Sequence, residues 1–194
     1  VDIAINMPLL FVLKNGKYLR PEGKTFKDFM EGKLTTRKNE EANIKDFETH
    51  LATIFSEVRL KKYIEIRSLD TCEWDCHCGG PAFYTGLIYG NLDQALEIIN
   101  KWKISEVLNA YNEAPKKGLN SIINNKTLLE WGKVFLDLSK KGLEKRSFKN
   151  NSHQDETIFL RSIESVLNNN KNKASITIEK FKKQKNLEFL YEKI

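Results

Sequence analysis

The stretch Glu57-Val58-Arg59-Leu60-Lys61-Lys62-Tyr63-Ile64-Glu65-Ile66-Arg67 alternates almost strictly between apolar and polar side chains. Because successive side chains of a β-strand point to opposite faces, the alternation predicts one strand with a buried apolar face. Lys62 interrupts that face. The other face carries two carboxylates, three cations and a phenol, in the order Glu57, Arg59, Lys61, Tyr63, Glu65 and Arg67. Such a face has the chemistry to hold a metal ion together with a polyphosphate.

Two interpretations of the charged face stay open at this point. Half-buried antiparallel strands often present a charged face that only meets water. An arginine beside a carboxylate also suits phosphate oxygens, which a guanidinium group binds with two hydrogen bonds. Arg59 and Glu57 are alternatively a surface ion pair, since they are two residues apart on one face. We expect His50 to brace the preceding helix rather than to act in catalysis.

Length and composition indicate a globular protein. The 194 residues suffice for one core, or for one core with an appended helical part. The net charge is +6, but the lysines are spread along the chain, so we expect no nucleic-acid partner. No apolar run reaches the roughly 18–20 residues that span a bilayer, so we expect no membrane partner. With no visible signal peptide in residues 1–6, we expect a cytoplasmic protein.

Three cysteines lie close together, at Cys72, Cys76 and Cys78, with His77 between the last two. An odd, tightly spaced set is not typical of a secreted disulfide framework. Structural zinc usually takes its ligands from two separated knuckles, and no second pair of cysteines exists here. We therefore expect reduced thiols in a packed loop and treat zinc as the less favoured alternative.

Apolar periodicity and turn residues predict a mixed first third and a helical remainder, which is an α+β fold. Strands are expected at 1–6, 9–13 and 18–20, with a hairpin turn at Asn15-Gly16. We expect Thr25 to cap a short helix that ends at Gly32. Helices are expected at 26–31, 44–55, 82–89, 92–102, 127–141, 155–167 and 175–190.

The string HLATIFSEVRLKKYIEIR, from His50 to Arg67, resembles the glutamate–cysteine ligases of the plant and proteobacterial type. The resemblance continues in Gly32-Lys33-Leu34, in Pro81-Ala82-Phe83 and at 142–146, and so extends over nearly the whole chain. It implies that residues 1–80 form the C-terminal portion of a glutamine-synthetase-like antiparallel catalytic sheet with helices. Residues 81–194 would then be a helical region packed on that sheet within the same domain.

The resemblance implies an ATP- and Mg²⁺-dependent ligase. Such an enzyme joins the γ-carboxylate of glutamate to the amine of cysteine through a γ-glutamyl phosphate, which is the first step of glutathione biosynthesis. By matching position, Glu65 is implied as a metal ligand and Arg67 as the catalytic residue that contacts the transferred phosphoryl group. The remaining implied roles are nucleotide binding by Arg59, Lys61 and Arg67, and substrate binding by Thr53, Tyr63 and Trp74.

The chain also departs from the family pattern. Ser68-Leu69-Asp70 stands where the family has Gly-Ala-Asp, and Ser56 replaces a proline, so we expect a differently shaped pocket loop. The family's catalytic domain is longer, so we expect this chain to be its C-terminal part, with a missing N-terminal catalytic segment as partner. Two alternatives stay open, a related γ-glutamyl ligase with another amine acceptor and a non-catalytic module that keeps the fold.

Overall fold

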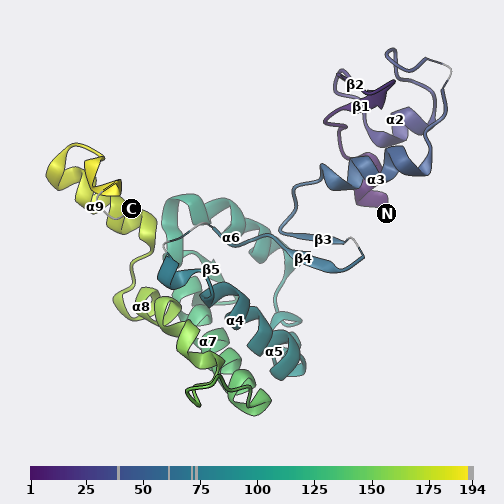
Figure 1. Cartoon of the computed structure of the whole chain (residues 1–194). Helices are drawn as coiled ribbons and strands as arrows, with labels where there is room; N and C mark the ends of the chain where they lie inside the picture. The colour runs from purple at the N-terminus through teal and green to yellow at the C-terminus, as the bar shows by residue number, and fades with distance from the viewer. Residues whose placement is uncertain (39, 61, 71, 73, 192–194) are drawn as a thin grey trace. The chain divides into compact units, whose positions relative to one another are not determined.

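The computed structural model describes residues 1–38, 40–60, 62–70, 72 and 74–191 (Figure 1). The chain folds as two compact units, Val1–Asp70 and Thr71–Ile194. Within the described residues, helices predominate and the strands form three separate two-stranded antiparallel hairpins. The fold class is therefore α+β, as predicted. The domain boundary expected at residue 80 stays a prediction.

The first unit begins with a short helix and a hairpin. Asn15 and Gly16 both have positive φ, 50° and 74°, which is the backbone that a two-residue hairpin turn requires. The pairing places Val12 opposite Leu19, so the predicted hairpin is confirmed. The elements of this unit are α1 (Asp2–Asn6), β1 (Val12–Lys14), β2 (Lys17–Leu19), α2 (Phe26–Met30), α3 (Ile44–Ala52), β3 (Val58–Leu60) and β4 (Ile64–Ile66).

The prediction of a strand at residues 1–6 is wrong, because these residues form α1. The side-chain amide of Asn6 donates a hydrogen bond to the backbone carbonyl of Asp2 at 2.8 Å, which closes the helical turn. A run this short contains less than two helical turns, so its apolar pattern does not distinguish a helix from a strand.

The predicted cap of α2 is confirmed in detail. The hydroxyl of Thr25 accepts a hydrogen bond from the backbone N–H of Asp28 at 3.1 Å. The carboxylate of Asp28 accepts one in return from the backbone N–H of Thr25 at 2.9 Å. This reciprocal pair satisfies two donors that the start of a helix leaves without a helical partner. Gly32 follows α2 with a φ of 69°, so the predicted stop is also confirmed.

Among the described residues of the first unit, two polar side chains are buried. Arg37 donates to Asp46 Oδ1 at 2.6 Å and to Glu40 Oε2 at 2.7 Å. Burial opposes its charge, but these two carboxylates outweigh burial and raise the pKa of Arg37. His50 stacks on Phe26, and its Nε2 lies 2.7 Å from the carbonyl oxygen of Ala4. His50 thus braces α3 against the core, as expected.

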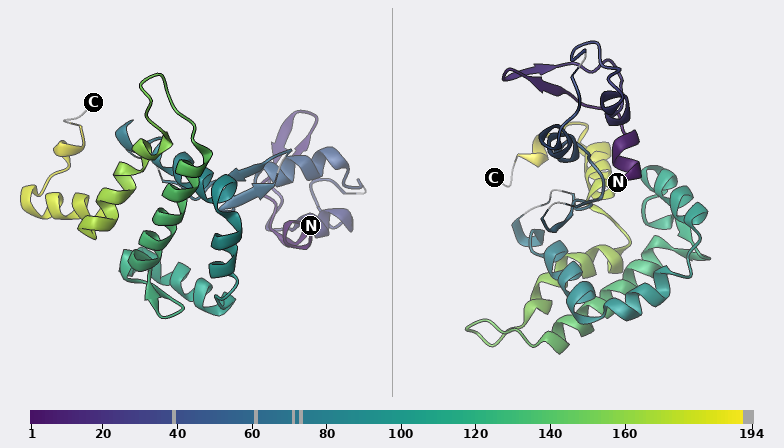
Figure 2. Two further views of the ribbon diagram at one scale, coloured as in Figure 1. Left: turned by 90° about the horizontal axis from the view of Figure 1, so that it is seen from below. Right: turned by 90° about the vertical axis from the view of Figure 1, so that its right-hand side faces the viewer.

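The second unit is mainly helical, and α7 runs beside α4 in the views of Figures 1 and 2. The helices predicted at 82–89, 92–102 and 127–141 are confirmed with shifted ends, whereas α6 and the β5–β6 hairpin were not predicted. The elements are η1 (Trp74–Cys76), α4 (Gly79–Thr85), the π-helical η2 (Gly86–Gly90), α5 (Leu92–Ile99), α6 (Ile104–Lys117), η3 (Gly118–Asn120), β5 (Ile122–Ile123), β6 (Lys126–Thr127), α7 (Leu128–Arg146), η4 (Glu156–Leu160), α8 (Arg161–Asn169), α9 (Lys173–Gln184) and η5 (Glu188–Leu190).

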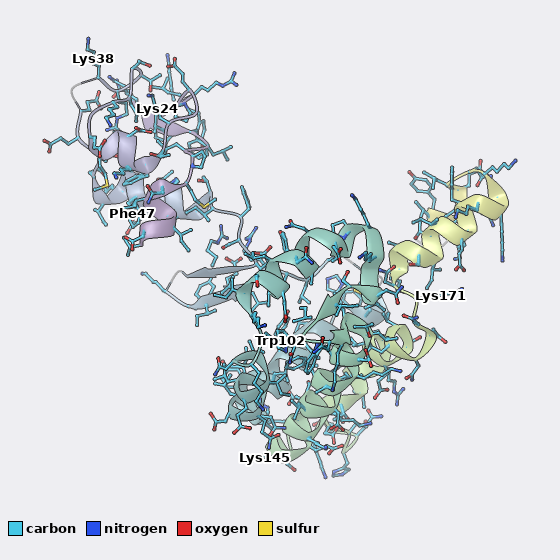
Figure 3. All side chains as sticks on the ribbon, turned by 180° about the vertical axis from the view of Figure 1, so that it is seen from behind. Lys24, Lys38, Phe47, Trp102, Lys145 and Lys171 are labelled. Carbon is cyan, nitrogen blue, oxygen red and sulfur yellow. A yellow bond between two sulfur atoms is a disulfide. The ribbon has the colours of Figure 1, made fainter. Side chains whose placement is uncertain are left out.

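The core of the second unit has an aliphatic part and an aromatic part. The aliphatic part packs α7 against α4 and α8 and contains Leu143 and Leu160, both fully buried. In the aromatic part, Trp131 donates through its indole N–H to the carbonyl of Ile123 at 2.8 Å. The ring of Trp102 lies 5.0 Å from that of Trp131, and Figure 3 shows Trp102 among the helices of this unit. Both parts use side chains of α7, so this helix organises the unit.

Glycines line the contact between η2 and α7. A Cβ on Gly86 would overlap the carbonyl oxygen of Ser139. A Cβ on Gly142 would overlap the carbonyl oxygen of Gly86 and lie 2.9 Å from its carbonyl carbon. The two backbones approach this closely only because no side chain stands between them. The side-chain amide of Asn91 adds a hydrogen bond to the carbonyl of Leu138 at 2.7 Å.

We predict that Gly142→Ala destabilises the second unit. Overpacking costs about 1–3 kcal/mol, and we expect the upper end because the clash is with backbone, even after the roughly 1 kcal/mol that alanine gains in helix propensity. Urea unfolding followed by near-ultraviolet circular dichroism of the tryptophans measures this loss. Lys141→Ala, at an exposed neighbouring position of α7, is the control. Equal midpoints for the two variants would contradict the prediction.

We predict that the hydrogen bonds at the start of α7 contribute folding stability that is lost in acid. The carboxylate of Glu130 accepts hydrogen bonds from the backbone N–H of Thr127 at 2.8 Å and from its hydroxyl at 2.7 Å, which holds the pKa of Glu130 below its ordinary value of 4.5. A lowered pKa means that the stabilisation is present above about pH 4.5 and is lost as the pH falls through the folded-state value. Melting temperatures of the wild type and Glu130→Gln should therefore differ at neutral pH and converge in acid. A difference between the two melting temperatures that grows as the pH falls would contradict the prediction.

Candidate active site

The predicted strand from Glu57 to Arg67 is a hairpin. Strand β3 pairs with β4 in antiparallel fashion, and Arg59 lies directly opposite Glu65. The prediction of one continuous strand is wrong because the chain reverses between Leu60 and Ile64, where Lys62 interrupts the alternation. Paired residues share a face, so Arg59 and Glu65 still fall on the same side of the ribbon.

The pattern predicts a buried apolar face, but two of the apolar side chains are more exposed than two of the charged ones. Val58 and Ile64, on the apolar face, are 56% and 70% exposed. On the charged face, the side chains of Arg59 and Glu65 are 10% and 28% exposed. The prediction of a buried apolar face is therefore wrong for these side chains, because hydrogen bonds draw the charged face against the end of α3.

Arg59 makes that connection. Its Nε and Nη2 both lie 2.8 Å from Oε2 of Glu65. Its Nη1 donates to the backbone carbonyl of Ala52, the last residue of α3, at 2.6 Å. A cation is favourable at this end of a helix because the terminal carbonyls carry partial negative charge. Arg59 thus fixes the orientation of the Glu65 carboxylate relative to α3.

Arg67 approaches the other oxygen of the same carboxylate. Its Nη1 donates to Oε1 of Glu65 at 3.3 Å, and its guanidinium carbon lies 5.5 Å from the ring centroid of Phe55. The side chain of Arg67 is 28% exposed, which is more than that of Arg59. Glu65 therefore lies between two guanidinium groups, and Arg67 is the more accessible of the two to an anionic substrate.

The other predicted site residues are more dispersed. Thr53 directly follows α3, and its hydroxyl donates to the carbonyl of His50 at 2.8 Å. Tyr63 is exposed near the hairpin turn, whereas Trp74 belongs to the second unit and is also exposed. Lys61 lies outside the described residues. The structure therefore brings together Arg59, Glu65 and Arg67.

Sequence reasoning missed Phe55, which it assigned to the preceding helix. The structure ends α3 at Ala52, and the exposed ring of Phe55 lies against the guanidinium group of Arg67. Such a contact is favourable because the face of an aromatic ring attracts a cation. The signal that could have found it is the position of Phe55 inside the same string that carries the family resemblance.

Glu65 alone does not fit a magnesium site. Magnesium requires a near-octahedral set of oxygen ligands, and both oxygens of Glu65 already accept hydrogen bonds from guanidinium groups. Across the part of the chain that the structure describes, no group of three or more His, Cys, Asp or Glu side chains could hold a metal ion. The assignment of Glu65 as a magnesium ligand stays a prediction.

The cysteine cluster also differs from expectation. Cys72 and Cys76 form a disulfide, with their Cα atoms 6.1 Å apart, while Cys78 is a free, exposed thiol. The prediction of reduced thiols is therefore wrong for the first two cysteines. The turn at η1 brings their Cα atoms within the distance that a disulfide spans, which an argument from cysteine number alone does not detect.

Comparison with known sequences identifies the family. Residues 4–192 match the sequence model of the glutamate–cysteine ligase family 2. The chain belongs to this family. It is 38% identical over 169 residues to the chloroplastic glutamate–cysteine ligase of Solanum lycopersicum, a match that covers 86% of this chain and 31% of the relative. It is 37% identical to ligase A of Oryza sativa subsp. indica and 36% identical to the Arabidopsis thaliana enzyme, covering 33% and 31% of those relatives.

This member of the glutamate–cysteine ligase family thus spans about a third of the length of the curated relatives it matches. Those relatives are named chloroplastic, and this contradicts the expectation of a cytoplasmic protein. Among the residues that the structure describes, no helix has the length and apolarity needed to cross a membrane.

We predict that Arg59→Leu loosens the hairpin. The change removes two donors to the partly buried Glu65 carboxylate, which keeps its contact with Arg67, and the donor to the exposed carbonyl of Ala52, so we expect a loss of about 1–2 kcal/mol in local stability. The backbone N–H of Arg67, which donates to the carbonyl of Glu57 at 2.7 Å, should then exchange with solvent about tenfold faster. Hydrogen-exchange NMR measures this rate. Lys62→Ala in the hairpin turn is the control, and equal exchange rates in the two variants would argue against the prediction.

Proposed function

We propose that this chain is part of an ATP-dependent ligase that joins the γ-carboxylate of glutamate to the amine of cysteine, the first step of glutathione biosynthesis. The observation that carries the proposal is the family match over residues 4–192. The relatives that share 36–38% of aligned residues are all named glutamate–cysteine ligases. The cluster of Arg59, Glu65 and Arg67 supports the proposal, because it presents positive charge for an anionic substrate.

The proposed chemistry has two steps. An oxygen of the glutamate γ-carboxylate attacks the γ-phosphorus of ATP, so that ADP leaves and an acyl phosphate forms. The cysteine amine then attacks the acyl carbon, phosphate leaves, and the amine gives up a proton as the amide bond forms. Both steps concentrate negative charge on phosphoryl oxygens, so a preorganised cation lowers the barrier by offsetting that charge.

Arg67 is the proposed catalytic residue. Its guanidinium group has the planar fork that binds two phosphoryl oxygens at once. The hydrogen bond to Glu65 and the contact with Phe55 restrict this group before substrate arrives. Such restriction reduces the entropy that binding would otherwise cost. Arg67 would therefore contact the phosphoryl group in both steps.

Arg59 is proposed mainly as a positioning residue. Three of its nitrogens already contact Glu65 and the carbonyl of Ala52, so its strongest contribution is to hold Glu65 in place. Its positive charge would still add to the potential felt by nucleotide phosphates, together with that of Lys61. Tyr63, Trp74 and Thr53 are proposed as substrate contacts, the first two because they offer exposed aromatic rings.

The relatives' additional length is proposed to complete the active site. A single two-stranded hairpin is only marginally stable in water and normally belongs to a larger sheet. The apolar face of β3–β4 is largely exposed, at 56% for Val58 and 70% for Ile64. We therefore propose that this hairpin is part of a glutamine-synthetase-like antiparallel sheet, to which an N-terminal catalytic segment supplies further strands and the remaining ligands of Mg²⁺.

We predict that Arg67→Lys abolishes most of the ligase activity. Lysine keeps the charge but not the two-pronged geometry, and removal of one well-placed donor to a developing oxyanion costs about 10²–10³ in kcat. The longest natural polypeptide that carries this chain should be assayed by mass spectrometry for γ-glutamylcysteine made from ATP, Mg²⁺, glutamate and cysteine. Lys45→Gln, at an exposed position of α3, is the matched control and should retain activity.

Three outcomes would count against the proposal. Equal activity of Arg67→Lys and Lys45→Gln would remove Arg67 from the mechanism. Joining of glutamate to another amine, with none to cysteine, would indicate a related γ-glutamyl ligase. A folded polypeptide that turns over no ATP with any acceptor would indicate a non-catalytic module.

A further inference from the structure

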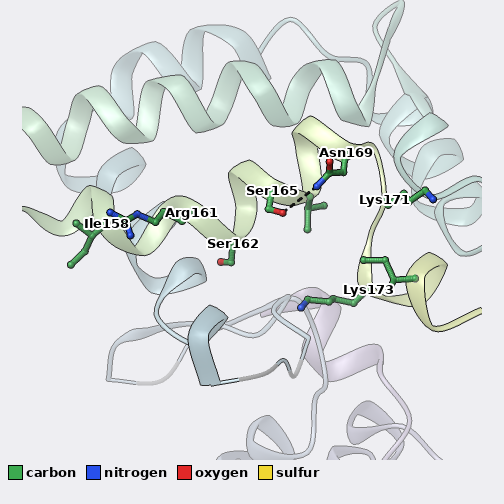
Figure 4. Close-up of a pocket in the computed structure, with 9 residues that line it drawn as sticks. Ile158, Arg161, Ser162, Ser165, Asn169, Lys171 and Lys173 are labelled. Carbon is green, nitrogen blue, oxygen red and sulfur yellow. Dashed lines mark hydrogen bonds between the residues drawn. The ribbon is translucent and has the colours of Figure 1, made fainter. Parts of the chain in front are cut away.

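A hollow of about 420 Å³ runs along α8 in the second unit (Figure 4). This volume is within the range of small-molecule sites in proteins. None of the residues that line it belongs to the hairpin of β3 and β4. Its lining consists of Ile158, Arg161, Ser162, Ser165, Val166, Asn169, Lys171, Lys173 and Ile176.

The lining is strongly positive. Arg161, Lys171 and Lys173 contribute three cations, and none of the described residues that line the hollow is an aspartate or glutamate. Ser162, Ser165 and Asn169 add hydroxyl and amide donors beside these charges. Guanidinium, ammonium, hydroxyl and amide groups together form the donor set that proteins use for phosphoryl oxygens.

The donors are arranged in a row. Arg161, Ser165 and Asn169 are four residues apart along α8, so they occupy one stripe of the helix, as Figure 4 shows. The eight-residue step from Arg161 to Asn169 spans about 12 Å at the helical rise. Lys171 and Lys173 follow beyond the end of α8. Arg161 thus marks one end of the row of donors on α8, and the amide of Asn169 marks the other.

Neighbouring contacts leave these donors suited to a ligand. Asn169 donates to the hydroxyl of Ser165 at 3.3 Å, which orients both side chains along the hollow. Lys171 pairs with Glu179 at 2.8 Å, but the two side chains are about half exposed, and such pairs are weak in water. Lys173 also has an interaction within the protein, so the argument depends on Arg161 and the donors of α8.

We propose that this hollow is a binding site for an elongated phosphorylated small molecule. One phosphoryl group would lie at the Arg161–Ser162 end and a second against the Ser165 hydroxyl and the Asn169 amide at the other end of the row, with the linking part over Val166 and Ile176. A single inorganic phosphate reaches only one end, so it would bind more weakly. The inference goes beyond the proposed ligase reaction and does not depend on it.

The test is a titration of the whole 194-residue chain followed by backbone-amide NMR. The probes are fructose 1,6-bisphosphate, ATP and inorganic phosphate, at about 0.15 M salt to screen unspecific charge effects. We expect shifts concentrated in residues 158–176 and affinity for at least one of the two larger probes about tenfold above that for phosphate. Whichever of fructose 1,6-bisphosphate and ATP binds more tightly then indicates whether the ligand is a sugar bisphosphate or a nucleotide.

Two variants and a matched control make the test specific. Ser165→Glu places a carboxylate inside the hollow at an exposed position, and Arg161→Gln removes one cation. Each should reduce affinity at least about tenfold, whereas Lys182→Gln on the exposed surface of α9 should not. Ser165→Glu carries the test alone if Arg161→Gln does not fold. Shifts spread over surface lysines, shifts confined to residues 58–67, equal losses in variant and control, or no binding at millimolar probe would each overturn the proposal.

Discussion

The contact between the Arg59 guanidinium group and the Glu65 carboxylate is the interaction on which the candidate site depends. It joins the end of α3 to both strands of the hairpin, and it presents one oxygen of Glu65 to Arg67. Without it, β3 and β4 would be joined mainly by a short backbone ladder, and α3 would lose its side-chain hydrogen bond to β3. For this reason the side chains of Arg59 and Glu65 on the charged face are less exposed than Val58 and Ile64 on the apolar face.

Beside its apolar core, the second unit depends on a close backbone contact that glycines allow. Gly86 and Gly142 allow the backbones of η2 and α7 to meet, and beside this contact the hydroxyl of Ser139 donates to the carbonyl of Phe83 in α4 at 2.9 Å. A π-helical segment widens the helix locally and shifts the residues that follow it. The glycine contact therefore holds η2, the segment between α4 and α5, against α7, whereas in the first unit a charge pair fixes the site.

The sequence predicted local features such as turns and helix caps, but it did not predict where the chain from Glu57 to Arg67 reverses direction. Asn15-Gly16 and Thr25 specify a turn and a cap through their own backbone and side-chain preferences. In one continuous strand, odd-numbered residues face one side and even-numbered residues face the other. A hairpin that pairs Arg59 with Glu65 also places odd-numbered residues opposite odd-numbered ones, so it gives the same two faces. Periodicity therefore cannot tell the two apart. The family resemblance indicated Arg59, Glu65 and Arg67 one by one, but their mutual contacts needed coordinates.

The exposed apolar face of the β3–β4 hairpin has a practical consequence for samples of this chain. The hairpin has open strand edges and exposes valine and isoleucine, and the unpaired backbone groups of such an edge can pair with a strand of another copy. Such self-association rises with concentration, and the net charge of +6 opposes it less as salt screens the repulsion. Low salt and low protein concentration should keep this chain monodisperse, and a covering strand would remove the difficulty altogether.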